Sequence, residues 1–404
     1  MNKLTRLTIN KFRNVKPTTL EFRPGINVVL GKNAAGKTTL LRLLSTLLGT
    51  FDEPVPDESL DTHISVTGDT EFEQSTLRKR LEEPTLPLNI GHRERSLQSS
   101  FHQTDALLFK HAGKSFLKAD LKSNEVALEA KDLQIRAPRG PYRNPILSIF
   151  SILSADRNKN APFLSRMLMD SYVKTAGRMD ESLESFNELF KIEGHLDVPS
   201  GKWIFDALPF SMVDLSFAPA PEGNSTNFSF PFLDRTAVKL GYDSATARFD
   251  VERFNLESGR HTVRLSNLKF FFRRADEEVS HEWLSYGQKR LLAFFAHVDA
   301  SPDIVIADEL VNGLHHEWIS ACLDEISDRQ AFLTSQNPLL LDFLRFESLE
   351  EVRHTFIICE RTGSAADAQL IWRNLTEDEA ESFFLAYQTG IQRVSDILLT
   401  KGLW

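Results

Sequence analysis

The most informative chemistry lies in a short segment near the start of the chain. Residues 31–38 read GKNAAGKT and fit the pattern G-x-x-x-x-G-K-[ST]. In this pattern the glycines let successive backbone N–H groups turn towards phosphate oxygens, and the start of the following helix favours bound anions. Lys37 reaches the β and γ phosphates of a nucleotide, and Thr38 binds Mg²⁺. The pattern therefore predicts a site for ATP and Mg²⁺, with these binding residues: Gly31, Asn33, Ala34, Ala35, Gly36, Lys37, Thr38 and Thr39.

A second pair of reactive side chains ends an apolar segment late in the chain. Residues 303–309 read DIVIADE, so two carboxylates follow a stretch with the character of a buried strand. A carboxylate at a strand end can hold Mg²⁺ through water, and its neighbour can act as the base that polarises the attacking water. We expect Asp308 to bind the metal and Glu309 to be the catalytic base.

A third motif lies shortly before this acidic pair. Residues 284–290 read LSYGQKR, and an apolar helical stretch, 291–298, follows. LSYGQ resembles the LSGGQ signature of ABC-type ATPases, and its distance from Asp308 suits that family. In that family the signature binds the γ phosphate of a nucleotide held by the opposite subunit, which implies this role for Ser285, Gly287 and Gln288. Taken alone, Ser285 would be read as the cap of an ordinary helix.

The opening of the chain narrows the resemblance. Residues 7–14 read LTINKFRN and residues 25–31 read GINVVLG, which is similar to the start of RecF, SMC and OLD proteins. The interval between Lys37 and Ser285 exceeds that of a transporter cassette and is too short for long coiled-coil arms. The resemblance covers residues 1–50 and about 280–345. It implies an ATPase of the RecF/SMC/OLD-like group, many of whose stand-alone members belong to bacterial anti-phage modules.

Two segments depart from the usual form of that family. Residues 311–316 read VNGLHH, which resembles the Gly-Leu-His form of the OLD-like branch and implies a place near a subunit interface for His315; two solvated histidines are the alternative. Where the family usually presents a histidine to the γ phosphate, this chain has Gln336. A glutamine donates a hydrogen bond but cannot become cationic, so we expect slower or partner-dependent hydrolysis. A plain turn before Pro338 is the other interpretation.

The elements that position these residues can be read from the same sequence. Alternating apolar residues predict strands around 7–10 and 20–22, and the apolar run 26–30 predicts a strand buried inside a sheet. Leucines at helical spacing between Leu40 and Leu48 predict a helix that Gly49 ends. Strand, glycine loop and helix thus follow in the order that a phosphate-binding loop requires.

We expect an α/β fold with three parts. Residues 1–50 and 280–404 form a P-loop ABC-ATPase core, residues 51–143 an appended antiparallel β lobe, and residues 144–279 an inserted, mainly helical lobe that leads to the signature. The C-terminal residues 375–399 begin with a capping box and carry one apolar stripe, which predicts helices that dock on the core.

Composition excludes several other classes of protein. The 404 residues carry 47 basic and 56 acidic side chains and a net charge of −9, so the chain is not a highly basic coat for nucleic acid. Its two cysteines, Cys322 and Cys359, allow neither a disulfide framework nor a four-cysteine zinc site and favour a reducing, cytoplasmic compartment. No apolar run has the length of a membrane span or the form of a secretory signal.

Two groups of basic residues bear on contact with DNA. Basic residues gather locally, and such groups can track phosphates or simply form a solvated face. The two groups are Arg136, Arg139 and Arg143, and Arg264, Lys269, Arg273 and Arg274.

Three functions are compatible with these motifs. The first is an ATP-hydrolysing protein that dimerises head to tail around ATP and transmits a conformational change to DNA or to a partner effector, in anti-phage defence or DNA repair. The second is a slow-turnover, ATP-dependent scaffold or sensor that holds a separate nuclease or toxin subunit. The third is a transporter ATPase, which the SMC-like opening and the long insertion suit least.

Overall fold

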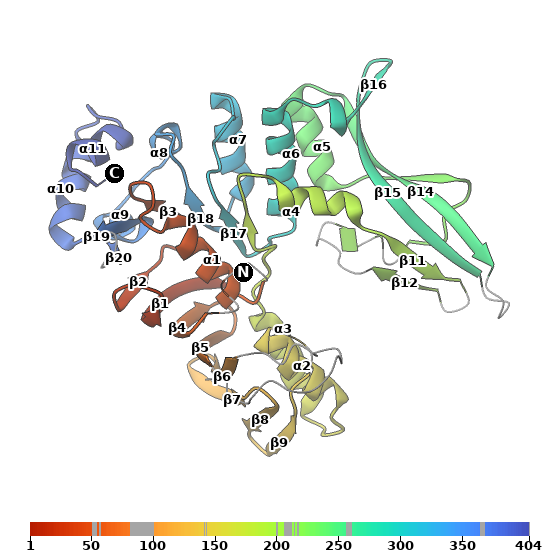
Figure 1. The fold of residues 1–404 in the computed structure, drawn as a ribbon, viewed down its shortest axis with the longest axis horizontal. Helices are drawn as coiled ribbons and strands as arrows, with labels where there is room; N and C mark the ends of the chain where they lie inside the picture. Colours follow the sequence, from red (N-terminus) through yellow and green to blue (C-terminus); the bar gives the residue numbers. More distant parts are fainter. Residues whose placement is uncertain are drawn as a thin grey trace, which may run out of the picture. The chain divides into compact units, whose positions relative to one another are not determined.

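The computed structural model, whose helices and strands are labelled in Figure 1, divides into two units. The first consists of Met1–Val173 and Arg345–Trp404, and the second of Lys174–Leu344. The residues that the structure describes are 1–50, 55, 58–80, 101–140, 142, 144–198, 201–205, 212, 213, 215, 218–255, 261–363 and 368–403. The limits of these units differ from the divisions expected after residues 50, 143 and 279, and each unit contains strands and helices.

The first unit contains an antiparallel sheet of eight strands in the order β2-β1-β4-β5-β6-β7-β8-β9. Its strands are β1 (Lys3–Phe12), β2 (Thr18–Glu21), β4 (Leu60–Thr67), β5 (Glu71–Arg80), β6 (Phe101–His111), β7 (Lys114–Leu121), β8 (Glu125–Ala130) and β9 (Leu133–Pro138). Leu7 and Ile9 are fully buried while Thr8 between them is not, which matches the predicted alternation. Leu7 lies opposite Ile64, so one sheet joins the N-terminal strands to the expected β lobe.

A smaller group of strands in this unit carries the glycine loop. β3 (Ile26–Leu30) runs parallel to β19 (Phe356–Thr362), with Val28 opposite Phe356, and β20 (Gln369–Asn374) is antiparallel to β19. β3 is buried from Asn27 onward, which explains its unbroken apolar character. The predicted helix follows as α1 (Lys37–Leu47) and buries its leucines. Strand, loop and helix therefore occur in the predicted order.

The remaining helices of the first unit form two groups. α2 (Pro145–Ala155) and α3 (Ala161–Ser171) pack on each other, and α10 (Glu377–Gln388) contacts both α9 (Leu349–Thr355) and α11 (Val394–Thr400). The capping box predicted near residue 376 is confirmed, because Thr376 and Glu379 each bond the other's backbone N–H.

The second unit contains three parallel strands that carry the acidic pair. β17 (Ile304–Ala307) lies between β10 (Arg178–Met179) and β18 (Gln330–Thr334), and every residue of β17 and β18 is buried. The helices of this part are α6 (Tyr286–Asp299), α7 (His316–Ile326) and the short α8 (Leu339–Asp342). α6 is buried on all sides over residues 290–296, and it packs against α7 and α5 (Pro231–Leu240).

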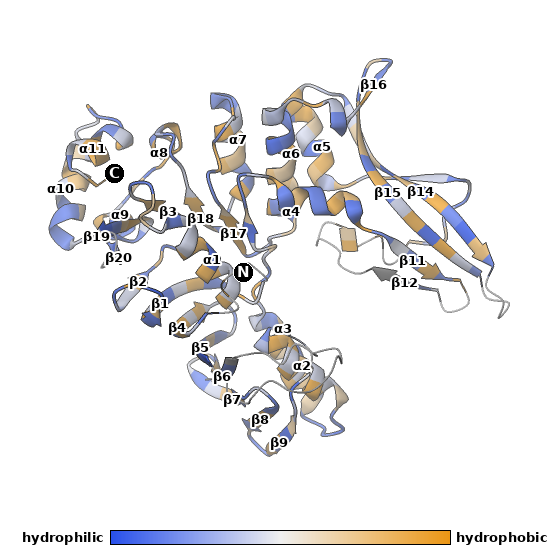
Figure 2. Cartoon of the chain, in the orientation of Figure 1, coloured by the Kyte–Doolittle hydropathy of each residue, from blue (hydrophilic) through white to orange (hydrophobic). Residues whose placement is uncertain are grey.

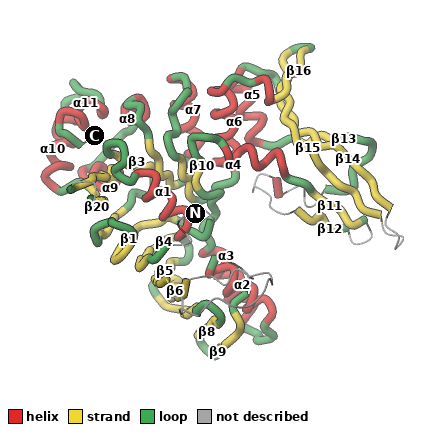
Figure 3. The backbone as a smooth tube through the Cα atoms, in the orientation of Figure 1, coloured by secondary structure: helices red, strands yellow, loops and turns green. Residues whose placement is uncertain are grey.

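The other part of the second unit is an antiparallel sheet (Figure 3). Its strands are β11 (Gly194–Asp197), β12 (Lys202–Phe205), β13 (Ser225–Phe228), β14 (Ser244–Asn255), β15 (His261–Arg274) and β16 (Glu277–Ser280). Figure 2 shows polar and apolar residues alternating along β14 and β15. Residues 144–279 are thus richer in strands than the expected helical lobe. The sequence does not reveal these strands because many of their outward residues are charged, and charged residues have a low intrinsic preference for strands. Pairing with residues on the neighbouring strand stabilises them here.

Candidate nucleotide-binding site

The glycine loop can adopt its path only with glycine at two positions. Gly31 has φ +144° and Gly36 has φ +89°, a region that other residues rarely occupy. A Cβ on Gly31 would lie 2.2 Å from the carbonyl oxygen of Cys359 on β19, and one on Gly36 would lie 2.9 Å from Leu370 on β20. The loop is therefore pressed against β19 and β20, and its other face is open, since Asn33 and Ala34 are exposed.

The start of α1 has the properties of an anion site. No described side chain caps its first N–H groups, and its first turn contains no acidic residue. Lys37 Nζ donates to the carbonyl oxygens of Gly31 at 2.8 Å and of Lys32 at 3.3 Å, so the ammonium is folded back over the loop. Thr38 is exposed and Thr39 partly buried beside it. Phosphate oxygens can replace the two carbonyls as partners of Lys37 and accept from the free N–H groups.

Arg13 belongs to this region, although it has no predicted role beyond its place in the segment that resembles the family. Its Nη1 donates to Thr39 Oγ1 at 3.5 Å, and its guanidinium forms an ion pair with Glu58. It follows β1 directly and has φ +47°, an unusual backbone for arginine. The signal available in the sequence was a cation immediately after the first predicted strand, β1.

Asp308 is held rigidly at the end of β17. Its backbone N–H donates to the carbonyl oxygen of Met179 at 2.9 Å, and its Oδ1 accepts from Thr334 Oγ1 at 2.6 Å. Its Oδ2 lies 3.4 Å from Arg178 Nη1. Asp308 is 5% exposed, so these partners rather than water set its orientation. The sequence predicted the carboxylate but neither Thr334 nor Arg178 as its partner.

Glu309 and Gln336 are brought together by the structure. Glu309 Oε2 accepts from the backbone N–H of Gln336 at 2.9 Å, and its Oε1 accepts from Gln336 Nε2 at 3.2 Å. The backbone N–H of Glu309 donates to Thr334 Oγ1 at 2.8 Å. Glu309 has φ +50°, a conformation of higher energy that needs such support. In this state both carboxylate oxygens of the predicted base are occupied by one glutamine.

The signature residues form the start of α6. Ser285 Oγ accepts from the backbone N–H of Gln288 at 3.4 Å, and the backbone N–H of Ser285 donates to Gln288 Oε1 at 2.9 Å. This capping box is the ordinary role that the sequence left open for Ser285. A Cβ on Gly287 would lie 2.6 Å from the carbonyl oxygen of Gly313, so the glycine permits close contact between α6 and the loop that follows the acidic pair.

Arg290 joins the signature helix to the acidic pair and was missed by sequence reasoning. Its side chain is fully buried and donates only to backbone carbonyls in the bonds that the structure shows. Nε bonds Leu310 at 3.0 Å, Nη1 bonds Glu181 at 3.0 Å and Nη2 bonds Asp308 at 3.1 Å. A shift of α6 would therefore move the loop after β17. Nothing in the sequence except its place in the signature helix marked this arginine.

The donor chemistry fits Mg²⁺. The Thr38 hydroxyl and the Asp308 carboxylate are hard oxygen ligands, which this ion prefers, and Mg²⁺ usually takes one or two protein ligands together with phosphate oxygens. Among the described residues no group of three or more His, Cys, Asp or Glu is arranged to hold a metal alone. Each unit thus contains one oxygen ligand of the kind that a nucleotide-bound Mg²⁺ takes.

The side chains of the predicted histidines and cysteines lie outside the contacts described above. His315 is exposed at the start of α7, and the ring of His316 lies 5.0 Å from that of Phe343. Both cysteines are buried, and burial raises the pKa of Cys359 to about 12, so its thiol stays protonated behind the loop. No helix in the described part of the chain is long and apolar enough to cross a membrane.

The basic groups considered for DNA are neutralised in part. Arg139 pairs with Asp105 at 3.1 Å, Arg264 pairs with both Glu193 and Glu252, and Lys269 lies 3.4 Å from Glu282. Arg273 donates to the carbonyl oxygen of Ala275, and Arg143 lies outside the described residues. Arg139, Arg264 and Lys269 are thus paired with acidic side chains, which lowers the positive charge that either group offers to a phosphate.

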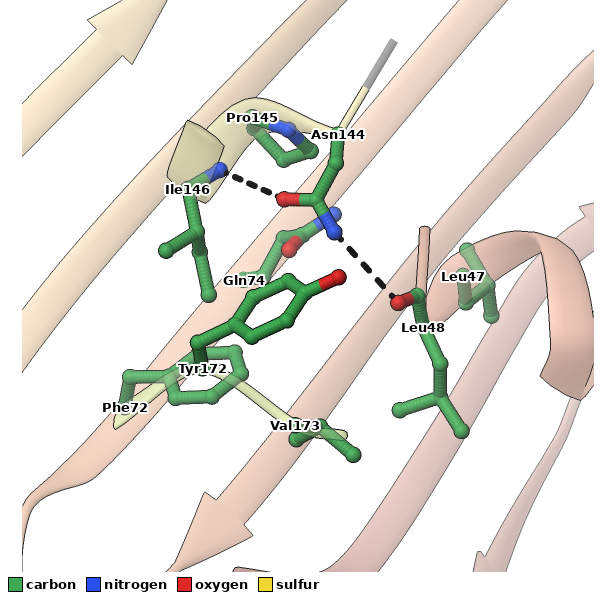
Figure 4. A pocket seen from close by; sticks show the side chains of 9 residues that line it. All are labelled: Leu47, Leu48, Phe72, Gln74, Asn144, Pro145, Ile146, Tyr172 and Val173. Carbon is green, nitrogen blue, oxygen red and sulfur yellow. Dashed lines mark hydrogen bonds between the residues drawn. The ribbon is translucent and has the colours of Figure 1, made fainter. Parts of the chain in front are cut away.

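A small cavity in the first unit is a separate feature (Figure 4). It lies between the end of α1 and the start of α2, where Asn144 Nδ2 donates to the carbonyl oxygen of Leu48 and Asn144 Oδ1 accepts from the N–H of Ile146. Its volume of about 10 Å³ suits one water at most, so it is not a nucleotide site. Its lining residues are Leu47, Leu48, Phe72, Gln74, Asn144, Pro145, Ile146, Tyr172 and Val173.

A phosphate loop between a buried strand and a helix, an acidic strand end and a signature helix together define an ABC-type P-loop ATPase of RecF/SMC-like character. Residues 26–342 match the model of the family described as "AAA domain, putative AbiEii toxin, Type IV TA system". Because the match covers most of the chain, the protein belongs to this family.

Matches to individual proteins are short or distant. The DNA replication and repair protein RecF of Psychromonas ingrahamii is 54% identical to this chain over 41 residues, which are 10% of this chain and 11% of that RecF. The RecF of Limosilactobacillus reuteri is 46% identical over 44 residues, which are 11% of this chain and 12% of that RecF. The chain thus spans about a tenth of these relatives.

Two solved structures superpose over most of the chain, but at low scores. The SMC head domain from Thermotoga maritima has a TM-score of 0.35 and 10% identity over 91% of this chain and 98% of its own. The Smc head domain bound to the C-terminal domain of ScpA, from Pyrococcus furiosus, has a TM-score of 0.39 and 11% identity over 96% and 100%. Superpositions at these scores assign no function.

Proposed function

We propose that the protein binds ATP with Mg²⁺ at the glycine loop and hydrolyses it. The observation that carries this proposal is the geometry of the loop. Two glycines hold a backbone path that other residues cannot take, the start of α1 is uncapped, and Lys37 rests on carbonyls that phosphate oxygens can replace. Family membership supports the same chemistry.

Each residue has a distinct role in this proposal. Lys37 binds the β and γ phosphates, and Thr38 and Asp308 hold Mg²⁺, which when bound neutralises charge on the phosphate oxygens. Glu309 accepts a proton from the attacking water, and Gln336 donates a hydrogen bond towards the γ phosphate. Gln336 donates one hydrogen bond to each carboxylate oxygen of Glu309 in this structure, which orients the base and leaves acceptor sites on both oxygens for the attacking water.

We further propose that two copies assemble head to tail around ATP. Ser285, Gly287 and Gln288 of one copy then contact the nucleotide on the loop of the other, and ATP holds the copies together until hydrolysis releases them. The resulting conformational change is passed to DNA or to a separate effector protein, in anti-phage defence or DNA repair. The short matches to RecF and the toxin–antitoxin wording of the family description support these two settings.

A second candidate function is a slow-turnover scaffold or sensor that holds an effector while ATP is bound. The specific observation in its favour is that Glu309 is paired with Gln336, a neutral side chain that cannot supply a positive charge during hydrolysis. A low basal ATPase rate that a partner raises would favour this candidate over constitutive hydrolysis.

Mixing two inactive variants tests both ATP use and the shared site. Lys37→Ala should abolish ATP binding, whereas Lys32→Ala, which removes the same charge from an exposed position of the loop, should retain it. Ser285→Arg should bind ATP but fail to dimerise. The mixture of Lys37→Ala and Ser285→Arg forms one complete composite site per heterodimer, so part of the ATPase activity should return. Full activity of Ser285→Arg alone would show that the site is not shared.

A further inference from the structure

We propose that Arg178 takes the place of Mg²⁺ on Asp308 while no nucleotide is bound, and that guanidinium and metal compete for this carboxylate. The inference rests on the proposed function, because it takes Asp308 as the metal ligand. It concerns only residues of the second unit.

The two oxygens of Asp308 have different kinds of partner. Oδ1 accepts from Thr334 Oγ1 at 2.6 Å, and this hydroxyl also accepts from the N–H of Glu309, so it belongs to the fixed framework of the site. Oδ2 is 3.4 Å from Arg178 Nη1, the longer and weaker of the two contacts. Oδ2 is therefore the oxygen that a metal ion, or water bound to it, can take over.

Charge explains why a cation is needed there. Asp308 and Glu309 are adjacent, are 5% and 7% exposed, and carry the same charge. Buried charges are unfavourable unless they are paired. Gln336 offers Glu309 only neutral donors, whereas Arg178 puts a positive charge on Asp308, with side chains 9% and 7% exposed. Arg178 thus supplies, before the metal arrives, the charge that Mg²⁺ supplies afterwards.

The pairing of β10 with β17 places the backbone of Arg178 beside the end of β17. β10 pairs with β17, with Arg178 opposite Ile306, and the carbonyl of Met179 accepts from the N–H of Asp308 at 2.9 Å. A guanidinium displaced from Asp308 would therefore remain within a side chain's length of the carboxylate. Lys37 likewise has partners within the protein, because its Nζ donates to the carbonyl oxygens of Gly31 and Lys32.

The test uses Mn²⁺ alone, titrated into nucleotide-free protein and followed by electron paramagnetic resonance. Arg178→Gln should bind Mn²⁺ about tenfold more tightly than the wild type, because a charge-assisted contact no longer competes. Arg235→Gln is the matched control, since Arg235 pairs with Asp299 and Glu325 in the same unit, and its Mn²⁺ affinity should equal that of the wild type. Adding Asp308→Asn to Arg178→Gln should remove the gain.

The outcomes separate this inference from the proposed function. Equal Mn²⁺ affinity in Arg178→Gln and wild type, or a gain that survives Asp308→Asn, overturns the competition even if the wild type binds ATP normally. Failure of the wild type to bind ATP overturns the proposed function instead. If circular dichroism shows that Arg178→Gln does not fold, Arg178→Lys replaces it in the test. Lysine makes a weaker ion pair with Asp308, so this variant should bind Mn²⁺ more tightly than the wild type. An unchanged Mn²⁺ affinity in Arg178→Lys overturns the inference.

Discussion

The glycine loop of the first unit and the acidic strand end of the second are positioned by different means. In the loop the binding groups are backbone N–H groups, and their placement depends on Gly31 and Gly36 fitting against β19 and β20. At the strand end the backbone brings two carboxylates to one edge, but side chains from three elements, Arg178, Arg290 and Thr334, set their orientation. A backbone site can be specified by a short motif, whereas a side-chain site draws on residues far apart in the sequence.

Replacing Glu309 by glutamine should produce the largest effect. The amide keeps the size of the side chain but cannot accept the proton of the attacking water, so turnover should fall about 10³-fold, or about 4 kcal/mol in the barrier. ATP binding should stay within twofold of the wild type, since the loop is untouched. Single-turnover hydrolysis and filter binding measure the two quantities, and wild-type turnover would assign the base to another residue.

Gly31→Ala tests how far the loop depends on its backbone. The new Cβ would meet the carbonyl of Cys359 at 2.2 Å with φ at +144°, so the free energy of unfolding should fall by about 3 kcal/mol and ATP binding should be lost. Gly113→Ala is the control, because Gly113 also has a positive φ, +73°, but nothing within 4 Å. It should lose only about 1 kcal/mol in urea unfolding. Equal losses would mean that the close approach is unimportant.

Thr334→Val tests the side-chain framework of the acidic pair. The substitution keeps the shape but removes the hydroxyl that bonds both Asp308 and the N–H of Glu309, so unfolding free energy should fall by about 2 kcal/mol. Hydrolysis should fall while ATP binding persists. Thr236→Val removes a buried hydroxyl that bonds only its own helix, at Phe232, and should lose less than about 1 kcal/mol. Similar losses in both variants would contradict the proposed framework.

The smallest predicted effect is a pH dependence in the second unit. Burial lowers the pKa of His297 to about 4, and its Nε2 bonds the carbonyl of Ile306, which links α6 to β17. The unfolded chain, with an ordinary pKa, binds more protons, so stability falls as pH drops below about 6.5. Between about pH 7 and about pH 5.5 the wild type should lose about 1 kcal/mol more than His297→Gln. If the unfolding free energies of the two proteins change with pH in parallel, His297 does not carry the expected pH dependence, which contradicts a neutral, buried imidazole in the fold.

Much of the first unit's site could be predicted from the sequence. The glycine pattern, the apolar run of β3 and the leucines of α1 lie within about twenty residues, so local sequence determines both the element order and the anion site. Arg13 and Glu58 were not recognised as part of the region because β1 and the residue beside β4 meet it only through the tertiary fold.

The second unit was harder to predict for a physical reason. Its carboxylates and signature helix are local motifs, but Arg178, Arg290 and Thr334 become partners only when separate elements pack together. The outward charged residues of β14 and β15 made these strands hard to predict, because charged residues have a low intrinsic preference for strands. In the fold they are stabilised by pairs across the sheet, such as Arg264 with Glu252. For the same reason the basic groups suggested a nucleic-acid surface, whereas several of those residues are bound to acidic neighbours.

The shared sheet of the first unit limits how this protein can be shortened or exchanged between relatives. β1 pairs with β2 on one side and with β4 on the other. Removal of residues 60–138 would therefore leave one edge of β1, the long N-terminal strand, unpaired. Exposed strand edges of this kind recruit other chains and aggregate. Evolution and protein engineering can therefore extend or trim the sheet at β9, where it ends, but not excise it at β4.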